Sequence, residues 1–301
     1  MNRRDFLVDG ALGVAALALA GCGSTGAKRG CPAAAVTASG RPVPRFNIAM
    51  AGYTYNKFNL DQTLADLEKF DVHYLCVKNF HLPFDSTPAQ IAEFRRKCVD
   101  HGVTPYGTGP ITMSTADEAK KYFDYTVALG AGVLVGVPGE KGPDGKMQSS
   151  RRMCEIVSDL SQQYGIKFAI HNHGANPKTG NPRLYPTVVA TNELIGDLAP
   201  TMGFCMDVAY TFADGFDPAE IVRVHHRRIF DGHLRNISDG GNGSSGIVAH
   251  QGVIDYLPFF RALAEVGYEG CLGLELANSF PKNPEWIPAS LGYFRGLVAA
   301  V

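Results

Sequence analysis

The chain has 301 residues, of which 45% are hydrophobic and 19% charged, so it can bury a substantial core and long disordered regions are not expected. Its 28 basic and 29 acidic side chains give a net charge of −1. A protein that binds nucleic acid needs a basic surplus to contact phosphates, so no nucleic-acid partner is expected. Seven cysteines in a chain of this length do not make a disulfide scaffold.

The first 22 residues have the features of an export signal. Arg3 and Arg4, followed by Asp-Phe-Leu, resemble a twin-arginine motif, and the apolar stretch after them is too short to span a bilayer. The stretch ends in Leu-Ala-Gly-Cys22, which resembles a bacterial lipobox with a lipidated cysteine. We therefore expect a signal peptide over 1–22, export to the periplasm, and membrane contact only through a lipid on Cys22. The alternative is a short buried helix or an uncleaved anchor.

Residues 23–44 are small, polar and rich in Gly and Pro, without hydrophobic periodicity. This composition is typical of a flexible linker. The catalytic domain is expected over 45–301.

From Phe46 onward, eight short apolar runs alternate with amphipathic stretches. Between the first two runs, Leu60, Leu64 and Leu67 have helical spacing. A second helix is expected to begin at Thr87 as N-cap, with Pro88 in its first position. The predicted strands are 46–53, 72–78, 103–109, 132–138, 166–171, 202–207, 229–234 and 271–276.

Strands that alternate with helices must pair in parallel. Residues 45–301 are 257 residues, about 32 for each of eight units, which favours a single (β/α)8 TIM barrel. An open doubly wound sheet is the alternative. No G-x-G-x-x-G follows the first strand, so a dinucleotide-binding fold has no support.

Ionisable residues gather at the ends of the last four predicted strands, where the chemistry of such a barrel collects. Each lies one strand further round the same rim, so their side chains can converge. Two imidazoles and two carboxylates suit Mn²⁺, Zn²⁺, Co²⁺ or Fe²⁺. The sequence therefore predicts one divalent metal ion held by His171, Asp207, His233 and Glu275.

Six segments in the right order resemble the xylose isomerase-like superfamily of TIM barrels, the sugar phosphate isomerase/epimerase group. They are KNFHLPFDSTP (78–88), FAIHNHG (168–174), GFCMDVAY (203–210), GHLRN (232–236), GVIDY (252–256) and GYEGCLGLELAN (267–278). The resemblance implies a metal bound by Glu, Asp, His and Glu, of which Asp207, His233 and Glu275 match the last three. We expect Glu275 to act as base as well as metal ligand, with His173 or Lys78 orienting the oxygens of the substrate.

The resemblance implies substrate contacts from Lys78, His81, His173 and Arg235, and Tyr210 is expected to contact the substrate as well. Two positions depart from the family pattern: His171 stands where most members have the first glutamate, and Tyr210 stands where a histidine is common. A metal-bound imidazole is a poor proton acceptor, so the two-carboxylate mechanism of the epimerases is in doubt for this chain.

The expected function is a metal-dependent isomerase or epimerase that abstracts a proton α to the carbonyl of a sugar or keto-sugar, with a metal-stabilised enediolate. One alternative is a lyase, dehydratase or hydratase acting on a 3-keto-glycoside or an inosose-like sugar, because elimination needs only one base. A second is a non-catalytic sugar-binding lipoprotein. A small-molecule sugar is the expected partner in each case.

Overall fold

The computed structural model describes residues 46–174, 184–238, 246–276 and 282–301. The predicted signal peptide, Cys22 and the linker lie outside the described residues. Eight parallel strands form a closed barrel in the order β1-β2-β3-β4-β6-β7-β8-β11, with β11 pairing back onto β1. The strands are β1 (Asn47–Ala51), β2 (Tyr74–Val77), β3 (Thr104–Met113), β4 (Val133–Lys141), β6 (Lys167–His171), β7 (Met202–Asp207), β8 (Ile229–Leu234) and β11 (Cys271–Leu274).

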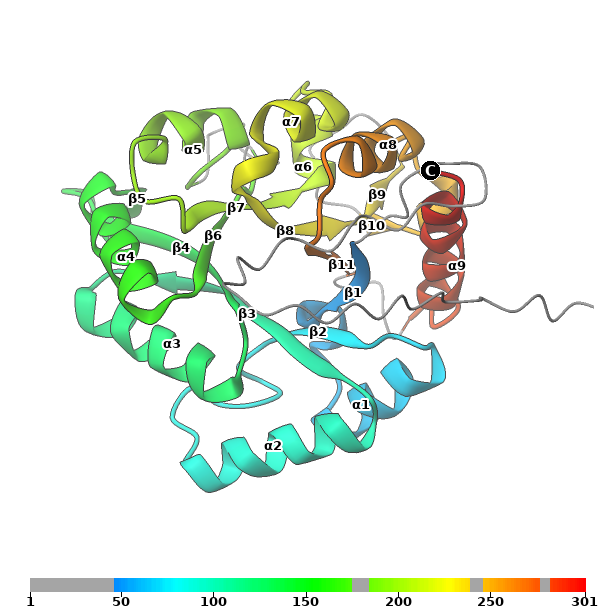
Figure 1. The fold of residues 1–301 in the computed structure, drawn as a ribbon, viewed down its shortest axis with the longest axis horizontal. Coiled ribbons are helices and arrows are strands. Elements are labelled where there is room, and N and C mark those ends of the chain that lie inside the picture. The colour runs from blue at the N-terminus through cyan, green and yellow to red at the C-terminus, as the bar shows by residue number, and fades with distance from the viewer. Residues whose placement is uncertain (1–45, 175–183, 239–245, 277–281) are drawn as a thin grey trace, which may run out of the picture. The chain divides into compact units, whose positions relative to one another are not determined.

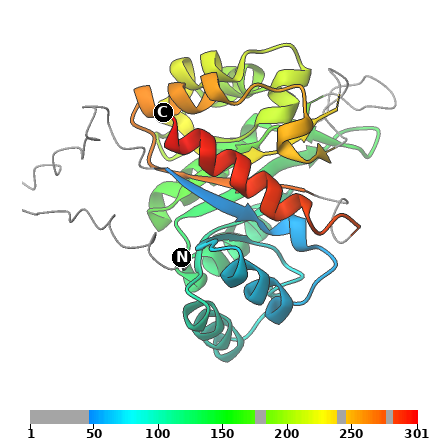
Figure 2. The same ribbon diagram turned by 90° about the vertical axis from the view of Figure 1, so that its right-hand side faces the viewer.

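Each of the eight strands falls within or overlaps one predicted run, so the predicted TIM barrel is confirmed. Helices surround the strands, and Figures 1 and 2 show this outer layer from two directions. The helices are α1 (Leu60–Lys69), α2 (Pro88–Asp100), α3 (Ala116–Leu129), α4 (Arg151–Tyr164), α5 (Val188–Ile195), α6 (Val208–Ala213), α7 (Pro218–His225), α8 (Leu257–Glu265) and α9 (Trp286–Ala299). Short 3-10 helices are η1 (Gly52–Tyr55), η2 (His226–Arg228) and η3 (Ala249–Gln251).

Local sequence explains where these helices begin and end. Thr87 caps α2 through a reciprocal pair of bonds with Gln90, as predicted, and Pro88 occupies the first turn. Gly130 and Gly165 end α3 and α4 with positive φ, a conformation that glycine adopts without strain. Two small hairpins were not predicted: β5 (Met147–Ser149) pairs with the end of β4, and β9 (Asn236–Ile237) pairs with β10 (Gly246–Ile247).

The apolar core has two parts. The larger lies between strands and helices and contains fully buried aromatic rings such as Phe94, Phe168 and Phe260. A smaller cluster includes Cys76, Val135 and Cys205 from three strands of the barrel. Among the described residues, every cysteine is buried and unpaired with another cysteine; these are Cys76, Cys98, Cys154, Cys205 and Cys271.

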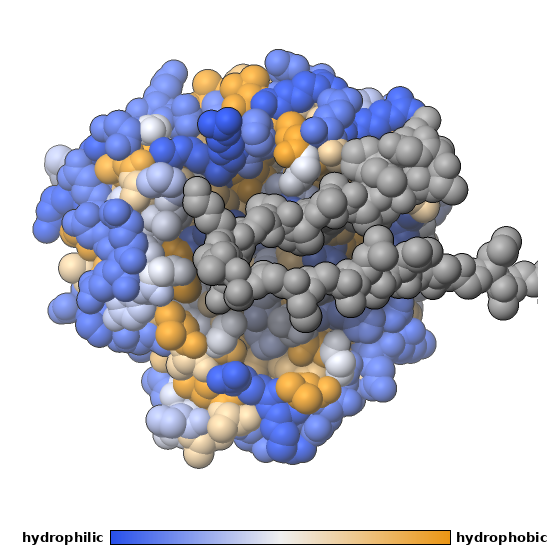
Figure 3. Space-filling model, viewed as in Figure 1, coloured by the Kyte–Doolittle hydropathy of each residue, from blue (hydrophilic) through white to orange (hydrophobic). Residues whose placement is uncertain are grey.

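Two surface properties complete the fold. In the view of Figure 3, hydrophilic side chains dominate the periphery, where the helices lie, with small hydrophobic groups between them. Within the described ranges, no helix is both long enough and apolar enough to span a bilayer.

Candidate active site

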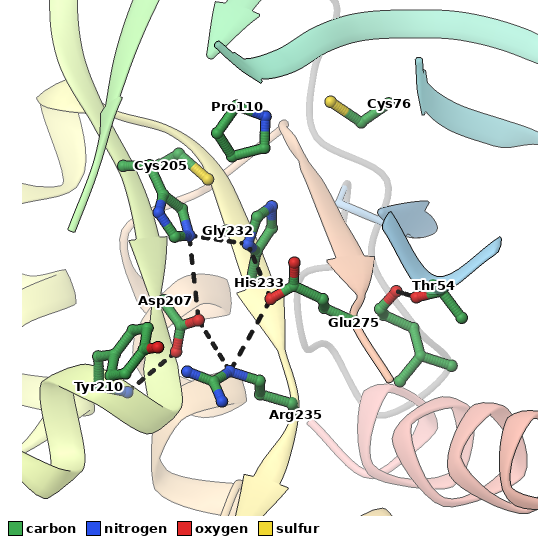
Figure 4. Close-up of polar contacts among 12 residues, drawn as sticks. Thr54, Cys76, Pro110, Cys205, Asp207, Tyr210, Gly232, His233, Arg235 and Glu275 are labelled. Carbon is green, nitrogen blue, oxygen red and sulfur yellow. Dashed lines mark hydrogen bonds and ion pairs between the residues drawn. The ribbon is translucent and has the colours of Figure 1, made fainter. Parts of the chain in front are cut away.

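Strand register brings the predicted metal ligands to one side of the barrel. Asp207 is the last residue of β7 and pairs in register with His233 of β8. His171 is the last residue of β6, and Glu275 directly follows β11. Figure 4 shows Asp207, His233 and Glu275 pointing toward one another from three neighbouring strands. The sequence therefore predicted a true spatial cluster.

The distances in this cluster suit a small divalent ion. His171 Nε2 lies 3.0 Å from His233 Nδ1 and 4.0 Å from Asp207 Oδ2. His233 Nδ1 lies 3.4 Å from Glu275 Oε2. Donors about 2.0–2.1 Å from a tetrahedral ion are themselves about 3.3 Å apart. These four side chains, two imidazoles and two carboxylates, are thus a chemically and geometrically suitable set for a divalent cation.

A guanidinium group shares the two carboxylates of this set. Arg235 Nε donates to Asp207 Oδ2 at 2.8 Å and lies 3.9 Å from Glu275 Oε2. Its guanidinium carbon stacks 4.2 Å from the ring centre of Tyr210. Tyr256 holds the same residue by donating its hydroxyl to the Arg235 carbonyl at 2.5 Å. Any metal ion at Asp207 therefore shares this carboxylate with a fixed positive charge.

Asp207 has a structural task as well. Its Oδ1 accepts from the backbone N–H of Tyr210 at 2.9 Å and so caps α6. Its own backbone N–H donates to Asn172 Oδ1 at 2.8 Å. Burial raises the pKa of the carboxyl, and the charge of Arg235 opposes this effect. Both oxygens of Asp207 are engaged, one by the helix and one by Arg235.

Glu275 and His233 form the second charged pair. Burial alone would raise the pKa of Glu275, but His233, Arg235 and Lys78 together lower it to about 2. For His233, burial would lower the pKa, but the Glu275 carboxylate, with smaller contributions from Asp231 and Asp207, raises it to about 9. At neutral pH the two side chains are therefore an ion pair, and a cation that takes His233 Nδ1 must displace a proton.

His173 supports the cluster from the loop after β6. Its Nε2 lies 3.2 Å from His171 Nδ1, and its ring centre is 6.4 Å from that of Tyr210. This contact fixes the orientation of the His171 ring, whose other nitrogen faces His233. Burial, together with the neighbouring His173 and His233, lowers the pKa of His171, which keeps it neutral and able to bind a metal.

Lys78 and His81 follow β2, on the other side of the barrel. Lys78 donates to the Pro110 carbonyl at 2.7 Å and lies 5.7 Å from the ring centre of Tyr53. Burial lowers the pKa of its amine. His81 is buried, with Nε2 3.2 Å from Thr63 Oγ1 of α1. The structure thus places Lys78 beside the site, whereas Nε2 of His81 contacts a helix of the outer layer.

Three residues of the site were missed from sequence. Thr54 Oγ1 donates to the Leu274 carbonyl at 2.9 Å and accepts from Leu276 N–H at 3.1 Å, so it holds the backbone on both sides of Glu275. Nothing local in the sequence signals this contact across more than 200 residues. Asn172 orients Asp207 through the hydrogen bond described above, and it lies between His171 and His173 in the sequence.

Asp231 is the third missed residue. It is fully buried, accepts from Tyr106 Oη at 2.9 Å and lies two residues before His233 on the same strand. Because side chains two apart on a strand share a face, the run IFDGHL contained the signal that points to it.

Comparison with known proteins places the fold. The family model for the xylose isomerase-like TIM barrel matches residues 64–297. A comparison with curated proteins found no match. Among solved structures, the IOLI protein with a bound zinc atom is 20% identical, with a TM-score of 0.67 over 84% of this chain and 98% of its own.

Two further structures have similar scores. The D-psicose 3-epimerase from Clostridium cellulolyticum H10, solved with D-tagatose, is 14% identical (TM-score 0.65; 84% of this chain, 99% of that one). The probable 3-DHS dehydratase AsbF from Bacillus anthracis is 12% identical (TM-score 0.65; 83% and 98%). These likenesses are likenesses of fold. Because the family model covers most of the chain, this protein belongs to the xylose isomerase-like TIM barrel family.

Proposed function

We propose that this protein is a metal-dependent isomerase or epimerase that acts on a sugar or keto-sugar by removing a proton α to a carbonyl. The observation that carries the proposal is the convergence of His171, Asp207, His233 and Glu275 at one side of the barrel mouth. Support also comes from the fold neighbours, which include an epimerase and a zinc-binding protein.

The four converging side chains would hold one divalent ion. When bound, such an ion supplies Lewis-acid polarisation of the substrate carbonyl and stabilises the negative charge that develops on its oxygen. The neighbouring zinc-bound structure makes Zn²⁺ one candidate, beside Mn²⁺, Co²⁺ and Fe²⁺.

Glu275 is the proposed base. His233, Arg235 and Lys78 lower its pKa and so keep it ionised in the neutral range, and its side chain is 13% exposed, so a substrate can reach it. Thr54 fixes the backbone on either side of the carboxylate, which limits its movement. A positioned carboxylate that accepts a proton contributes about 10²–10⁴-fold to such reactions.

Lys78 and His173 are proposed to orient the oxygens of the substrate. The Lys78 amine lies close enough to Glu275 to lower its pKa and reaches the mouth of the barrel from the opposite side. His173 is partly exposed beside His171 and can donate to a hydroxyl group. Tyr210 and Arg235 are proposed to contact the substrate. Arg235 would then weaken its hydrogen bond to Asp207 in order to donate to the substrate.

A lyase or dehydratase is the second candidate, and the engagement of Asp207 favours it. Epimerisation through two bases needs two carboxylates that can accept protons. One oxygen of Asp207 caps α6 and the other accepts from Arg235. Of the four converging side chains, Glu275 is therefore the carboxylate that can still accept a proton. Elimination of water or an aglycone needs one base and one acid, and the fold neighbour AsbF is a probable dehydratase.

Incubation in D₂O with a panel of keto-sugars and 3-keto-glycosides tests both candidates. An isomerase or epimerase incorporates deuterium at one carbon and leaves the skeleton intact. A lyase or dehydratase releases the aglycone or water. If purified, metal-loaded protein binds these sugars but neither exchanges deuterium nor eliminates a group, the protein is a sugar-binding lipoprotein and the enzymatic proposal is wrong.

The exported, lipid-anchored state is proposed on the pattern of residues 1–22 alone. If Cys22 carries the lipid, Cys22→Ser releases the protein from the membrane fraction, whereas Cys31→Ser, in the following linker, does not. Equal membrane association of both variants would contradict the anchor.

A further inference from the structure

A second group of metal-binding side chains overlaps the set already described, because it shares His171 and His233 with that set. Asp207, His233 and Glu275 offer ligand atoms within 4.8 Å of one another, and so do His171, Cys205 and His233. The first group presents oxygen, nitrogen and oxygen. The second presents nitrogen, sulfur and nitrogen, and all three of its side chains are buried.

Strand register explains why Cys205 reaches the histidines. His171 of β6 pairs in register with Cys205 of β7, and neighbouring residues paired in this way project to the same face of the sheet. Cys205 also lies two residues before Asp207 on the same strand, so both face the interior. In Figure 4 the sulfur of Cys205 points toward the imidazole of His233.

One nitrogen of His233, which belongs to both groups, is left unsatisfied by the contacts described above. His233 is fully buried, and its Nε2 has no hydrogen-bond partner among the described residues, because the contacts to His171 and Glu275 both use Nδ1. A buried polar atom without a partner is costly, and a bound ion is one of the few things that satisfies it. The sulfur itself has only a long contact, 3.6 Å, to Asp231 Oδ2.

Arg235 makes the first group less favourable for a cation than the second. It bonds to a carboxylate of the first group at 2.8 Å and lies 3.9 Å from the other, so a cation there must share both with a guanidinium. The second group takes its sulfur and one imidazole from positions that are not ion-paired to Arg235. A soft thiolate with two imidazoles also favours different metals from those favoured by carboxylates.

We propose that Cys205 is a metal ligand, which with His171 and His233 gives this protein a site for a thiophilic divalent ion, Zn²⁺ or Co²⁺, in preference to Mn²⁺ or Mg²⁺. The inference rests on the proposed function because it uses two of the same histidines. On binding, the S–H bond of Cys205 and one N–H bond of the protonated His233 ring break, metal–sulfur and metal–nitrogen bonds form, and both protons pass to the solvent. No electron transfer is involved.

Cobalt spectroscopy on the full-length protein tests this inference without any substrate. Metal-free protein titrated with Co²⁺ should develop a near-ultraviolet sulfur-to-cobalt charge-transfer band. Cys205→Ser should lose the band and bind Zn²⁺ at least about tenfold more weakly. Cys76→Ser is the matched control, since Cys76 is also buried in the barrel interior and bonds instead to the Gly109 carbonyl, and it should keep the band.

The outcomes separate this inference from the proposed function. Co²⁺ binding without the band in the unmodified protein overturns the role of Cys205, and does so even if the serine variant fails to fold. A band that persists in Cys205→Ser overturns it too. A Cys205-dependent band in a protein that transforms no sugar supports the ligand while contradicting the proposed enzyme.

Discussion

The two halves of the barrel differ in what they place inside it. The arc from β6 through β7 and β8 to β11 carries His171, Asp207, His233 and Glu275. The arc from β1 to β4 carries mainly small or apolar interior side chains, such as Cys76 and Val135, with Lys78 at its rim. The proposed metal ligands and base are therefore gathered on one arc, whereas the other arc supplies mainly packing.

This contrast makes a general prediction. Substitutions of the converging side chains on the β6–β11 arc should change activity and metal content, whereas those on the β1–β4 arc should change stability with little effect on either. The predictions below concern Glu275, Asp207, His81 and Thr54, in decreasing order of expected effect.

Glu275→Gln should lower kcat by about 10³-fold, because it removes the proposed base while keeping the shape of the side chain. The comparison variant is Glu265→Gln, an exposed carboxylate paired with Arg223, which should leave turnover unchanged. Turnover and the thermal unfolding midpoint are measured for both. A Glu275→Gln enzyme within tenfold of the unmodified rate would remove Glu275 from the mechanism.

Asp207→Ala should lower bound metal and also destabilise the fold, by about 3–5 kcal/mol, because the buried Arg235 guanidinium loses its bond to this carboxylate. Asp207→Asn keeps the helix cap and should recover part of the stability but not the metal. Metal content per chain and unfolding in urea check these effects. Unchanged metal stoichiometry in both variants, and in His233→Ala, would refute the assignment of these side chains as ligands.

His81, on the β1–β4 arc, should make stability depend on pH. Burial lowers the pKa of its imidazole from 6.5 to about 4, so the unfolded chain binds a proton between these values that the folded chain does not. Its contribution is therefore complete above pH 6.5 and is lost as the pH falls toward 4. The free energy of unfolding, relative to His81→Gln, should drop by about 3 kcal/mol across this window.

Urea unfolding of both proteins at pH 7 and pH 4 gives this difference directly. Parallel pH dependence in the two proteins would show that His81 is not neutral in the fold. A large loss of turnover in His81→Gln at pH 7 would place it among the reactive groups, and so break the contrast between the arcs.

Thr54→Val should cost about 1–2 kcal/mol of stability, because two buried backbone groups beside Glu275 lose their partner. Thr54→Ser restores the hydroxyl and should behave almost as the unmodified protein. A modest fall in kcat with KM unchanged would show that the hydroxyl also positions Glu275. Equal stability of the valine and serine variants would contradict the bonding role.

The strands and the convergence of Asp207, His233 and Glu275 could be predicted because both follow from local sequence patterns. Strand and helix periods are local, and parallel strands align their ends at one rim, so Asp207, His233 and Glu275 could be brought together on paper. A contact that a side chain makes across the barrel cannot be predicted from local sequence. Thr54 meets the end of β11 only because the barrel closes, and no neighbouring residue signals this.

Electrostatic competition was also invisible in the sequence. Arg235 was expected to contact substrate, but its buried bond to Asp207 depends on side-chain directions that strand order does not give. The same applies to Cys205, which the sequence presents as one more buried thiol.

The seam between β1 and β11 joins the first and last strands of the barrel. During synthesis β1 leaves the ribosome more than 200 residues before β11. The edge of β1 that pairs with β11 therefore stays open to other chains until translation is nearly finished. A nascent chain cut short before Cys271 would lack both the closing strand and the segment that Thr54 grips. Such fragments should aggregate instead of folding into a smaller barrel, which makes late truncation a more damaging lesion than its length suggests.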